Sequence, residues 1–326
     1  MFAFLGIILG IVLLIGGGTA LVAGASRIAS RFGVSPMIIG LTVVGFGTSA
    51  PELVVNILGA MTGQTELAFG NVIGSNISNL GLVLGTAAII QSIDLKGKVI
   101  QREIPLLLLI TTIMTVMALD GVFENRAPRF SQSDAVVLLL LFGIFIYITV
   151  QDVVIANRDD ALITDVSRNH LVTPEQQSGY QWLWVLAGFA LLFIGGHITV
   201  TQSVSLATQL GVAPSIIGLF VVAVGTSMPE LVTSIVAAMR RESDLALGNV
   251  IGSNIFNSLI VLPASALAAP VIIPAGGIFD LSVSWLFAAV LIPIFFLRNA
   301  SIGRLSGIFL LVAYIVYAVY RLKGDF

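Results

Sequence analysis

The sequence predicts an all-α membrane protein whose ten transmembrane helices form two inverted five-helix repeats, with both termini outside. Three observations predict this fold class. The 326-residue chain is 57% hydrophobic and only 10% charged, and its mean hydropathy is +1.05, so it has too few charges to cover the surface of a soluble domain. Apolar segments of about 20 residues recur along the chain. One long stretch containing polar residues occurs twice.

Ten segments are long and apolar enough to cross a bilayer, which requires about 20 residues of helix. They cover residues 4–24, 36–61, 66–90, 103–119, 134–152, 181–207, 213–239, 244–268, 281–297 and 304–320. The first segment has no basic residues before it and is longer than the apolar part of a signal peptide, so we expect it to be retained. The absence of cysteine excludes disulfides and thiolate metal sites.

Residues 33–79 and 211–257 are two copies of one sequence. At a constant offset of 178, they are identical at 30 of 47 positions. The match extends weakly upstream, where Gly17 and Gly18 align with Gly195 and Gly196. The chain is therefore a duplicated molecule, and we expect a first five-helix half at 1–152, a linker at 153–179 and a second half at 180–326.

Positive charges predict how the chain is oriented in the membrane. With the N-terminus outside, eleven lysines and arginines fall in cytoplasmic loops and only four fall outside, as the positive-inside rule favours. The linker is then cytoplasmic. Five spans per half make the second half enter the membrane from the opposite side, so the loop at Gln64 is external and the loop at Arg241 is cytoplasmic. Inverted repeats are typical of secondary transporters, whose substrate site lies near the bilayer midplane.

The repeated motifs GTSAPEL and GTSMPEL place Glu52 and Glu230 inside apolar segments. An ionisable residue at such a position indicates function. Pro51 has no amide hydrogen and obstructs the helical bond to the carbonyl of Gly47, which frees backbone oxygens. Carbonyl, hydroxyl and carboxylate oxygens together suit hard cations such as Na⁺ and Ca²⁺. The side chains that supply them are Thr48, Ser49 and Glu52 in the first copy and Thr226, Ser227 and Glu230 in the second.

A second motif, GNVIGSNISN or GNVIGSNIFN, follows each glutamate. Ser75 and Asn79, like Ser253 and Asn257, are four residues apart and therefore share one helix face. We expect these faces to complete the cation site. The glycines of the motif allow helices to approach closely, so we interpret Gly70, Gly74, Gly248 and Gly252 as packing residues.

These paired motifs resemble the two α-repeats of the sodium/calcium exchanger family, within the calcium/cation antiporter superfamily, and the chain fits the short prokaryotic form of that family. The resemblance implies that spans 2, 3, 7 and 8 enclose the ions and that spans 1 and 6 slide across them. It implies Na⁺/Ca²⁺ antiport by alternating access in the cell inner (plasma) membrane. Membrane lipid and the two transported ions are the partners it implies, with no cofactor, nucleic acid or protein partner.

The resemblance also implies a set of ion ligands. Its side chains are Thr48, Ser49, Glu52, Ser75, Asn79, Thr226, Ser227, Glu230, Ser253 and Asn257, and its backbone carbonyls belong to Gly45 and Ala223. At Asn257, some relatives, including potassium-dependent exchangers, carry aspartate.

Three alternatives remain open from the sequence. A proton/calcium antiporter would use the same glutamates. The resemblance argues against it, because members of the proton-coupled branch have Gly-Asn-Ala where this chain has Gly47-Thr48-Ser49. A passive cation channel also needs a polar midplane. An intramembrane enzyme has the least support, because no Ser–His or Asp–Asp pairing with a catalytic geometry is evident.

Other ionisable residues receive structural interpretations. We interpret His197 as a neutral histidine bonded to a neighbouring helix rather than as a proton carrier, because its counterpart at the same offset is Thr19. Seven acidic residues lie at predicted span ends, where we expect water or lipid headgroups to solvate them. They are Asp94, Glu103, Asp120, Glu124, Asp134, Asp152 and Asp280.

Overall fold

The computed structural model describes residues 2–94, 98–123, 127–167, 180–209, 226–296 and 301–323. The first half contains α1 (Phe2–Phe32), α2 (Pro36–Ile39), the π-helical turn η1 (Gly40–Val44), α3 (Gly45–Thr48), α4 (Ala50–Met61), α5 (Thr65–Ser78), the π-helical turn η2 (Asn79–Val83), α6 (Leu84–Ile90), β1 (Ile93–Asp94), α7 (Lys98–Phe123), β2 (Arg129–Phe130) and α8 (Gln132–Ser167). The second contains α9 (Gln181–Gln209), α12 (Met228–Met239), α13 (Ser243–Phe256), the π-helical turn η4 (Asn257–Val261), α14 (Leu262–Ala268), β3 (Val271–Ile272), α15 (Gly277–Phe296), β4 (Ser301–Ile302) and α16 (Arg304–Lys323).

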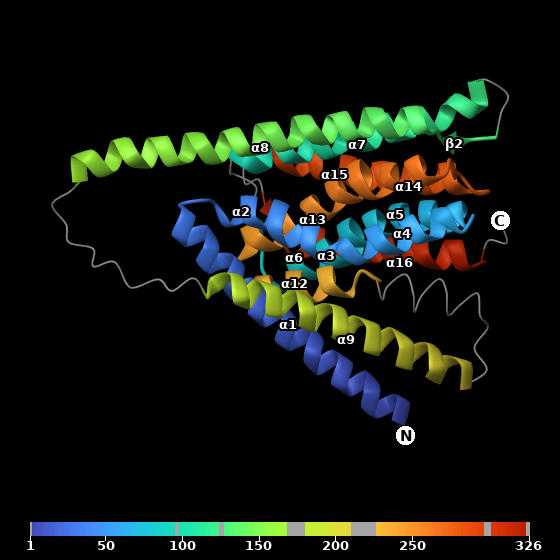
Figure 1. Cartoon of the computed structure of the whole chain (residues 1–326), viewed down its shortest axis with the longest axis horizontal. Helices are drawn as coiled ribbons and strands as arrows, with labels where there is room; N and C mark the ends of the chain where they lie inside the picture. Colours follow the sequence, from blue (N-terminus) through green and yellow to red (C-terminus); the bar gives the residue numbers. More distant parts are fainter. Residues whose placement is uncertain are drawn as a thin grey trace.

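The helices form a central group with flanking helices on either side (Figure 1). The continuous helices α5–α6 and α13–α14 are the most buried of the long apolar helices. The segment from α2 to α3 packs on α13, and α4 packs on α14. On one side lie α7 and α8, and on the other α1 and α9 lie side by side (Figure 1). This arrangement puts both repeated motifs in the centre of the molecule.

Seven helices in the described part of the chain are long and apolar enough to cross a membrane, or eight if one bent pair counts as a single span. The bent pair is Pro36–Thr48 with Ala50–Met61, and it corresponds to the predicted span at 36–61. Shorter apolar helices at Met228–Met239 and Gly277–Pro293 fall in two further predicted spans. Residues 210–225, which include the first part of the predicted span at 213–239, lie outside the described residues. The total of ten therefore stays a prediction.

The long contact between α1 and α9 depends on glycines spaced seven apart. A Cβ atom at Gly17 would lie 2.8 Å from the backbone nitrogen of Leu192, and one at Gly195 would lie 2.8 Å from the carbonyl of Gly10. Gly24 and Gly188 meet the opposite backbone at 3.0 Å or less. Any larger side chain here would force the helices apart, so these glycines allow two backbones to touch along their length.

The two copies of the repeat have the same backbone conformation at matching positions. The glutamate helices α4 and α12 both begin after a serine with nearly the same conformation, Ser49 with φ −88° and ψ 6° and Ser227 with φ −86° and ψ 7°. The turn after each helix has a positive φ, 80° at Gly63 and 62° at Arg241. The π-helical turns η2 and η4 begin at Asn79 and Asn257, also 178 residues apart. The duplication seen in the sequence thus extends to individual dihedral angles.

Short strands join the halves, a feature that an all-α prediction misses. Strand β1 pairs antiparallel with β4, with Ile93 opposite Ile302. Strand β2 pairs antiparallel with β3, with Phe130 opposite Val271. Each strand has only two residues, which is too short for an alternating pattern to be visible. In each pair, a strand that follows one motif helix meets a strand from the other half.

The predicted linker at 153–179 begins as a continuation of α8, which extends to Ser167. Residues 153–167 contain neither proline nor glycine, so nothing in this polar sequence breaks the helix. Residues 168–179 lie outside the described residues.

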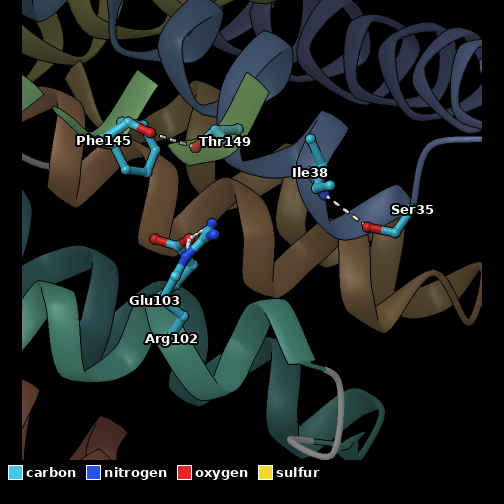
Figure 2. Close-up of polar contacts among 6 residues, drawn as sticks. All are labelled: Ser35, Ile38, Arg102, Glu103, Phe145 and Thr149. Atoms are coloured by element: carbon cyan, nitrogen blue, oxygen red, sulfur yellow. Dashed lines mark hydrogen bonds and ion pairs between the residues drawn. The ribbon is translucent and has the colours of Figure 1, made fainter. Parts of the chain in front are cut away.

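Two of the acidic residues that we expected to be solvated are instead buried and paired. Glu103 is fully buried and forms an ion pair with Arg102 (Figure 2). Asp280 is 7% exposed, lies 3.1 Å from the guanidinium of Arg321 and accepts a 2.9 Å hydrogen bond from Tyr317. Their burial is tolerated because each charge has a partner. The expectation of solvation was wrong for both, since helix packing covers these span ends.

Candidate functional site

Each glutamate lies in the first turn of a helix that begins directly after a non-helical serine, Ser49 or Ser227. In the first repeat the axis bends by 42° between Thr48 and Ala50, and Pro51 in the first turn of α4 cannot continue the preceding ladder. Glu52 and Glu230 are each 1% exposed. A buried carboxylate pair inside an apolar protein is costly unless it is charge-compensated, so this geometry indicates binding of cations.

The half of the site that contains Glu230 is hydrogen-bonded across the two repeats. Ser49 donates a 2.9 Å bond to Oε1 of Glu230. Ser253 donates a 3.1 Å bond to the carbonyl of Gly45. The hydroxyl of Thr48 lies 3.4 Å from that of Ser253. Five of the predicted ligands are therefore brought together here, with contributions from both halves of the chain.

The half of the site that contains Glu52 has fewer short contacts among the described residues. Neither carboxylate oxygen of Glu52 has a hydrogen-bond partner among the described residues. Ser227 contacts the Ser75 hydroxyl at 3.4 Å, and Thr226 contacts Oδ1 of Asn71 at the same distance. These residues also come from opposite repeats, as in the first half of the site, but their contacts are at the long limit for a hydrogen bond.

The two motif asparagines are buried at the π-helical turns. Asn79 donates a 3.0 Å bond to Oδ1 of Asn254. The amide of Asn257 has no hydrogen-bond partner among the described residues although it is 1% exposed. The predicted carbonyl ligand Ala223 lies outside the described residues. Of the motif glycines, Gly248 and Gly252 are packing residues, because a Cβ atom there would lie 2.5 Å from the carbonyl of Met37 and 2.2 Å from that of Leu41. A Cβ atom at Gly70 or Gly74 would meet no described residue within 4 Å, so their packing role stays a prediction.

Sequence reasoning missed one residue on each motif helix. Asn71, Ser75 and Asn79 follow a spacing of four, and so do Asn249, Ser253 and Asn257, so a longer search of the same helix face would have found Asn71 and Asn249. Asn249 is fully buried and bonds to residues of both repeats. The amide oxygens of Asn249 and Asn71 contact the hydroxyls of Thr48 and Thr226, respectively.

A cavity of about 460 Å³ leads toward the site from one side. It lies between α4 and α9, and Thr226 is part of its wall. The exposed side chain of His197 also lines it. No hydrogen bond joins this histidine to a neighbouring helix in the described part of the chain, so our structural interpretation of His197 finds no support there. The other lining residues are Ala50, Pro51, Val54, Val55, Leu192, Phe193, Gly196, Val200 and Pro229.

The donor set is chemically uniform. It consists of two carboxylates with hydroxyl, amide and carbonyl oxygens, and no group of three His, Cys, Asp or Glu side chains that could hold a metal ion gathers within the described ranges. Oxygen ligands suit hard cations, whereas nitrogen and sulfur ligands suit transition metals. The site is therefore suited to Na⁺ or Ca²⁺.

Comparison with known proteins identifies the family. The family described as sodium/calcium exchanger protein matches residues 2–151 and 180–323. The chain belongs to the sodium/calcium exchanger family. Its relatives include CaxA from Alkalimonas amylolytica, 36% identical with 95% of this chain and 96% of that protein covered. The sodium/calcium exchanger MaX1 from Methanosarcina acetivorans is 30% identical, with 97% of each chain covered.

The fold agrees with a solved exchanger. A structure of the sodium-calcium exchanger NCX_Mj, soaked with Na⁺ and Sr²⁺, has a TM-score of 0.82 and 31% identity, with 97% of each chain covered. The sodium/calcium exchanger family consists of multi-pass membrane antiporters rather than enzymes. This protein is accordingly a membrane antiporter of cations, which confirms the transporter class expected from the sequence.

Proposed function

We propose that the protein exchanges Na⁺ for Ca²⁺ by alternating access, with both ions using one midplane site between the repeats. The observation that carries this proposal is the pair of fully buried glutamates, Glu52 and Glu230, surrounded by neutral oxygens from both repeats. The proposed ligands are the ten side chains and two carbonyls named above. We further propose that the protein resides in the inner membrane of a prokaryotic cell.

The two carboxylates explain how exchange can be coupled. Together they neutralise one Ca²⁺ completely, so a calcium-loaded site can be buried at modest electrostatic cost. Without cations, two negative charges would have to be buried together, which is expensive. The ion-free site therefore rarely changes from one side of the membrane to the other. Inward movement of Na⁺ is consequently coupled to outward movement of Ca²⁺.

Sodium coupling is favoured over proton coupling by the hydroxyls beside each glutamate. Thr48 and Ser49, with Thr226 and Ser227, supply neutral oxygens that a proton would not need but that Na⁺ uses as ligands. Proton coupling is the second candidate, because buried glutamates can also accept protons. A channel is disfavoured by the burial of both glutamates.

Calcium uptake into proteoliposomes distinguishes these candidates. Vesicles are loaded in turn with Na⁺, K⁺ or a pH gradient, and an ionophore clamps the voltage in each case. We expect internal Na⁺ alone to drive uptake of external Ca²⁺. Uptake driven by the pH gradient without Na⁺ would identify a proton antiporter, and calcium flux that needs no counter-ion would identify a channel.

We also propose that the halves are inverted, as ten spans with an external N-terminus require. The antiparallel strand pairing between the halves supports this proposal. The helices also support it, because α1 and α9 run in opposite directions in Figure 1. The cavity beside α4 would then open to the outside, since α4 leads to the predicted external loop at Gln64.

Cysteine labelling tests the inversion directly. The natural chain has no cysteine, so single cysteines can be introduced at Gln64 and at Ser243, which lie at the starts of α5 and α13. A membrane-impermeant thiol reagent should label Gln64→Cys from outside intact cells and Ser243→Cys only after the membrane is opened. Labelling of both variants from the same side would contradict the inverted arrangement.

A further inference from the structure

Asn249 has hydrogen bonds that connect the glutamate helix of the second repeat with a threonine of the first. Its amide nitrogen donates to the carbonyl of Glu230 at 3.2 Å and to the hydroxyl of Ser234 at 2.9 Å. Its amide oxygen accepts a 3.1 Å bond from the hydroxyl of Thr48. The residue is fully buried, so these three protein groups, rather than water, determine the orientation of its amide.

The two bonds from the nitrogen leave only one orientation for the amide. Both the Glu230 carbonyl and the Ser234 hydroxyl accept from Nδ2. A flipped amide would place its oxygen against the Glu230 carbonyl, and two acceptors cannot form a hydrogen bond. The oxygen of Asn249 must therefore face Thr48. A buried amide held in this way is a fixed acceptor at a fixed position.

The fixed acceptor determines where the Thr48 proton points. A hydroxyl has one proton and two lone pairs, and it can bind a cation only through a lone pair. Donation to Asn249 leaves the lone pairs of Thr48 available to the site. Without Asn249, the proton would turn to another acceptor beside Thr48, either the carbonyl of Gly45 at 3.3 Å or the carboxylate of Glu230. Both are themselves proposed ligands.

We propose that Asn249 is a positioning residue that tunes the site for Na⁺ by orienting the hydroxyl of Thr48. The inference rests on the proposed function, because it assumes that Thr48 binds Na⁺. It also predicts a specific pattern. Loss of Asn249 should weaken the binding of Na⁺ more than that of Ca²⁺. The carboxylates of Glu52 and Glu230 dominate the binding of a divalent ion, and Asn249 donates no hydrogen bond to either carboxylate.

The counterpart Asn71 offers a matched control. Its oxygen contacts Thr226 at 3.4 Å, but its nitrogen has no hydrogen-bond partner among the described residues. Asn56 stands where the second repeat has Ser234, and neither polar atom of its amide has a described partner. The orientation of Asn71 is therefore less constrained than that of Asn249.

The test compares Asn249→Leu with Asn71→Leu in proteoliposomes. Two half-saturating concentrations are measured, that of Na⁺ in Na⁺-driven calcium uptake and that of Ca²⁺ in calcium/calcium exchange without Na⁺. For Asn249→Leu we expect the Na⁺ value to rise about three- to tenfold, the scale of one hydrogen bond, and the Ca²⁺ value to change less than twofold. Asn71→Leu should raise the Na⁺ value less. Asn249→Ser, which is smaller and cannot reach Thr48, is the second variant if the leucine protein does not fold.

Further variants separate positioning from general stability. Ser234→Ala removes one bond of Asn249 but leaves the Glu230 carbonyl to hold the amide, so it should raise the Na⁺ value less than Asn249→Leu. Combining Asn249→Leu with Thr48→Val should add little to the effect of Thr48→Val alone, because both act through one hydroxyl. Equal rises in the Na⁺ and Ca²⁺ values, an unchanged Na⁺ value, or fully additive effects would overturn the inference. A wild-type protein without Na⁺-driven uptake would instead overturn the proposed function.

Discussion

The half-site at Glu230 has a short hydrogen bond from the opposite repeat to its carboxylate, whereas the half-site at Glu52 has none among the described residues. Ser49 donates to Glu230 at 2.9 Å, but the carboxylate of Glu52 has no described partner. The motifs that form the two half-sites differ at one position of seven, Ala50 against Met228. Near-identical sequences therefore have different described hydrogen bonds at their two carboxylates.

The backbone does not account for this difference, because the serine at each break has nearly the same dihedral angles. The side chains around the breaks do differ. Asn249 is anchored by Ser234. In the first repeat the position of Ser234 is taken by the larger Asn56, and no described hydrogen bond joins Asn56 to Asn71. The cavity also lies beside Pro51 and Thr226, on the side of the loosely bonded half-site.

The glutamates themselves should produce the largest effect. We expect Glu52→Gln and Glu230→Gln each to reduce Na⁺-driven calcium uptake by about 100-fold or more, because removing one of two buried charges leaves Ca²⁺ only half neutralised. Uptake into proteoliposomes measures the loss. Each substitution keeps the side-chain volume, so the variants should remain folded in detergent.

Thermal unfolding in detergent provides the control for the glutamate variants. Calcium should raise the melting temperature of the wild-type protein, since a ligand that binds only the folded state stabilises it, and should raise that of either variant much less. Without calcium, Glu52→Gln should raise the melting temperature more than Glu230→Gln. The buried charge removed at Glu52 has no described hydrogen-bond donor, whereas the charge at Glu230 accepts a bond from Ser49. Normal exchange by both variants would refute the assignment of the site.

A smaller and unequal effect is expected for the two serines. Ser49→Ala removes the 2.9 Å donor to the Glu230 carboxylate, a charge-assisted bond worth about 1.5–3 kcal/mol. Ser227→Ala removes a 3.4 Å contact with another hydroxyl. In ion-free detergent, Ser49→Ala should lower the melting temperature more than Ser227→Ala. If the two variants melt together, the difference between the half-sites does not persist in solution.

The sequence was sufficient to predict the parts of this protein that repeat. Glu52 and Glu230 could be found because a carboxylate in an apolar segment is conspicuous and both recur at one offset. The breaks at Ser49 and Ser227 followed from the prolines two residues later. These features depend on local chemistry, which the sequence displays directly.

Features that depend on tertiary contact were not predictable. The strand pairs contain two residues each and join segments more than 140 positions apart. The burial of Glu103 and Asp280 depends on which helices cover them. The role of Asn249 depends on Thr48, 201 positions away. A periodic pattern within one helix contains no information about such partners.

The last comparison between the halves concerns Asn79 and Asn257, and it predicts that exchange does not require potassium. Asn79 is hydrogen-bonded to Asn254 at 3.0 Å, whereas Asn257 is buried without a described partner. The resemblance to potassium-dependent exchangers breaks down at Asn257, because those relatives are known for aspartate there. This site therefore has two central carboxylates where theirs have three.

A third carboxylate would balance the charge of one more monovalent cation, and without it that cation would be buried with its charge uncompensated. The amide oxygen of Asn257 can contact a cation but carries no net charge to neutralise it. Sodium-driven calcium uptake should accordingly continue at an unchanged rate when lithium or choline replaces all potassium at the same clamped voltage. Asn257→Asp is the matched variant, because it restores the third carboxylate at the same position. Uptake by the natural protein that stopped without potassium and resumed on its addition would show that two carboxylates do not limit the site in this way.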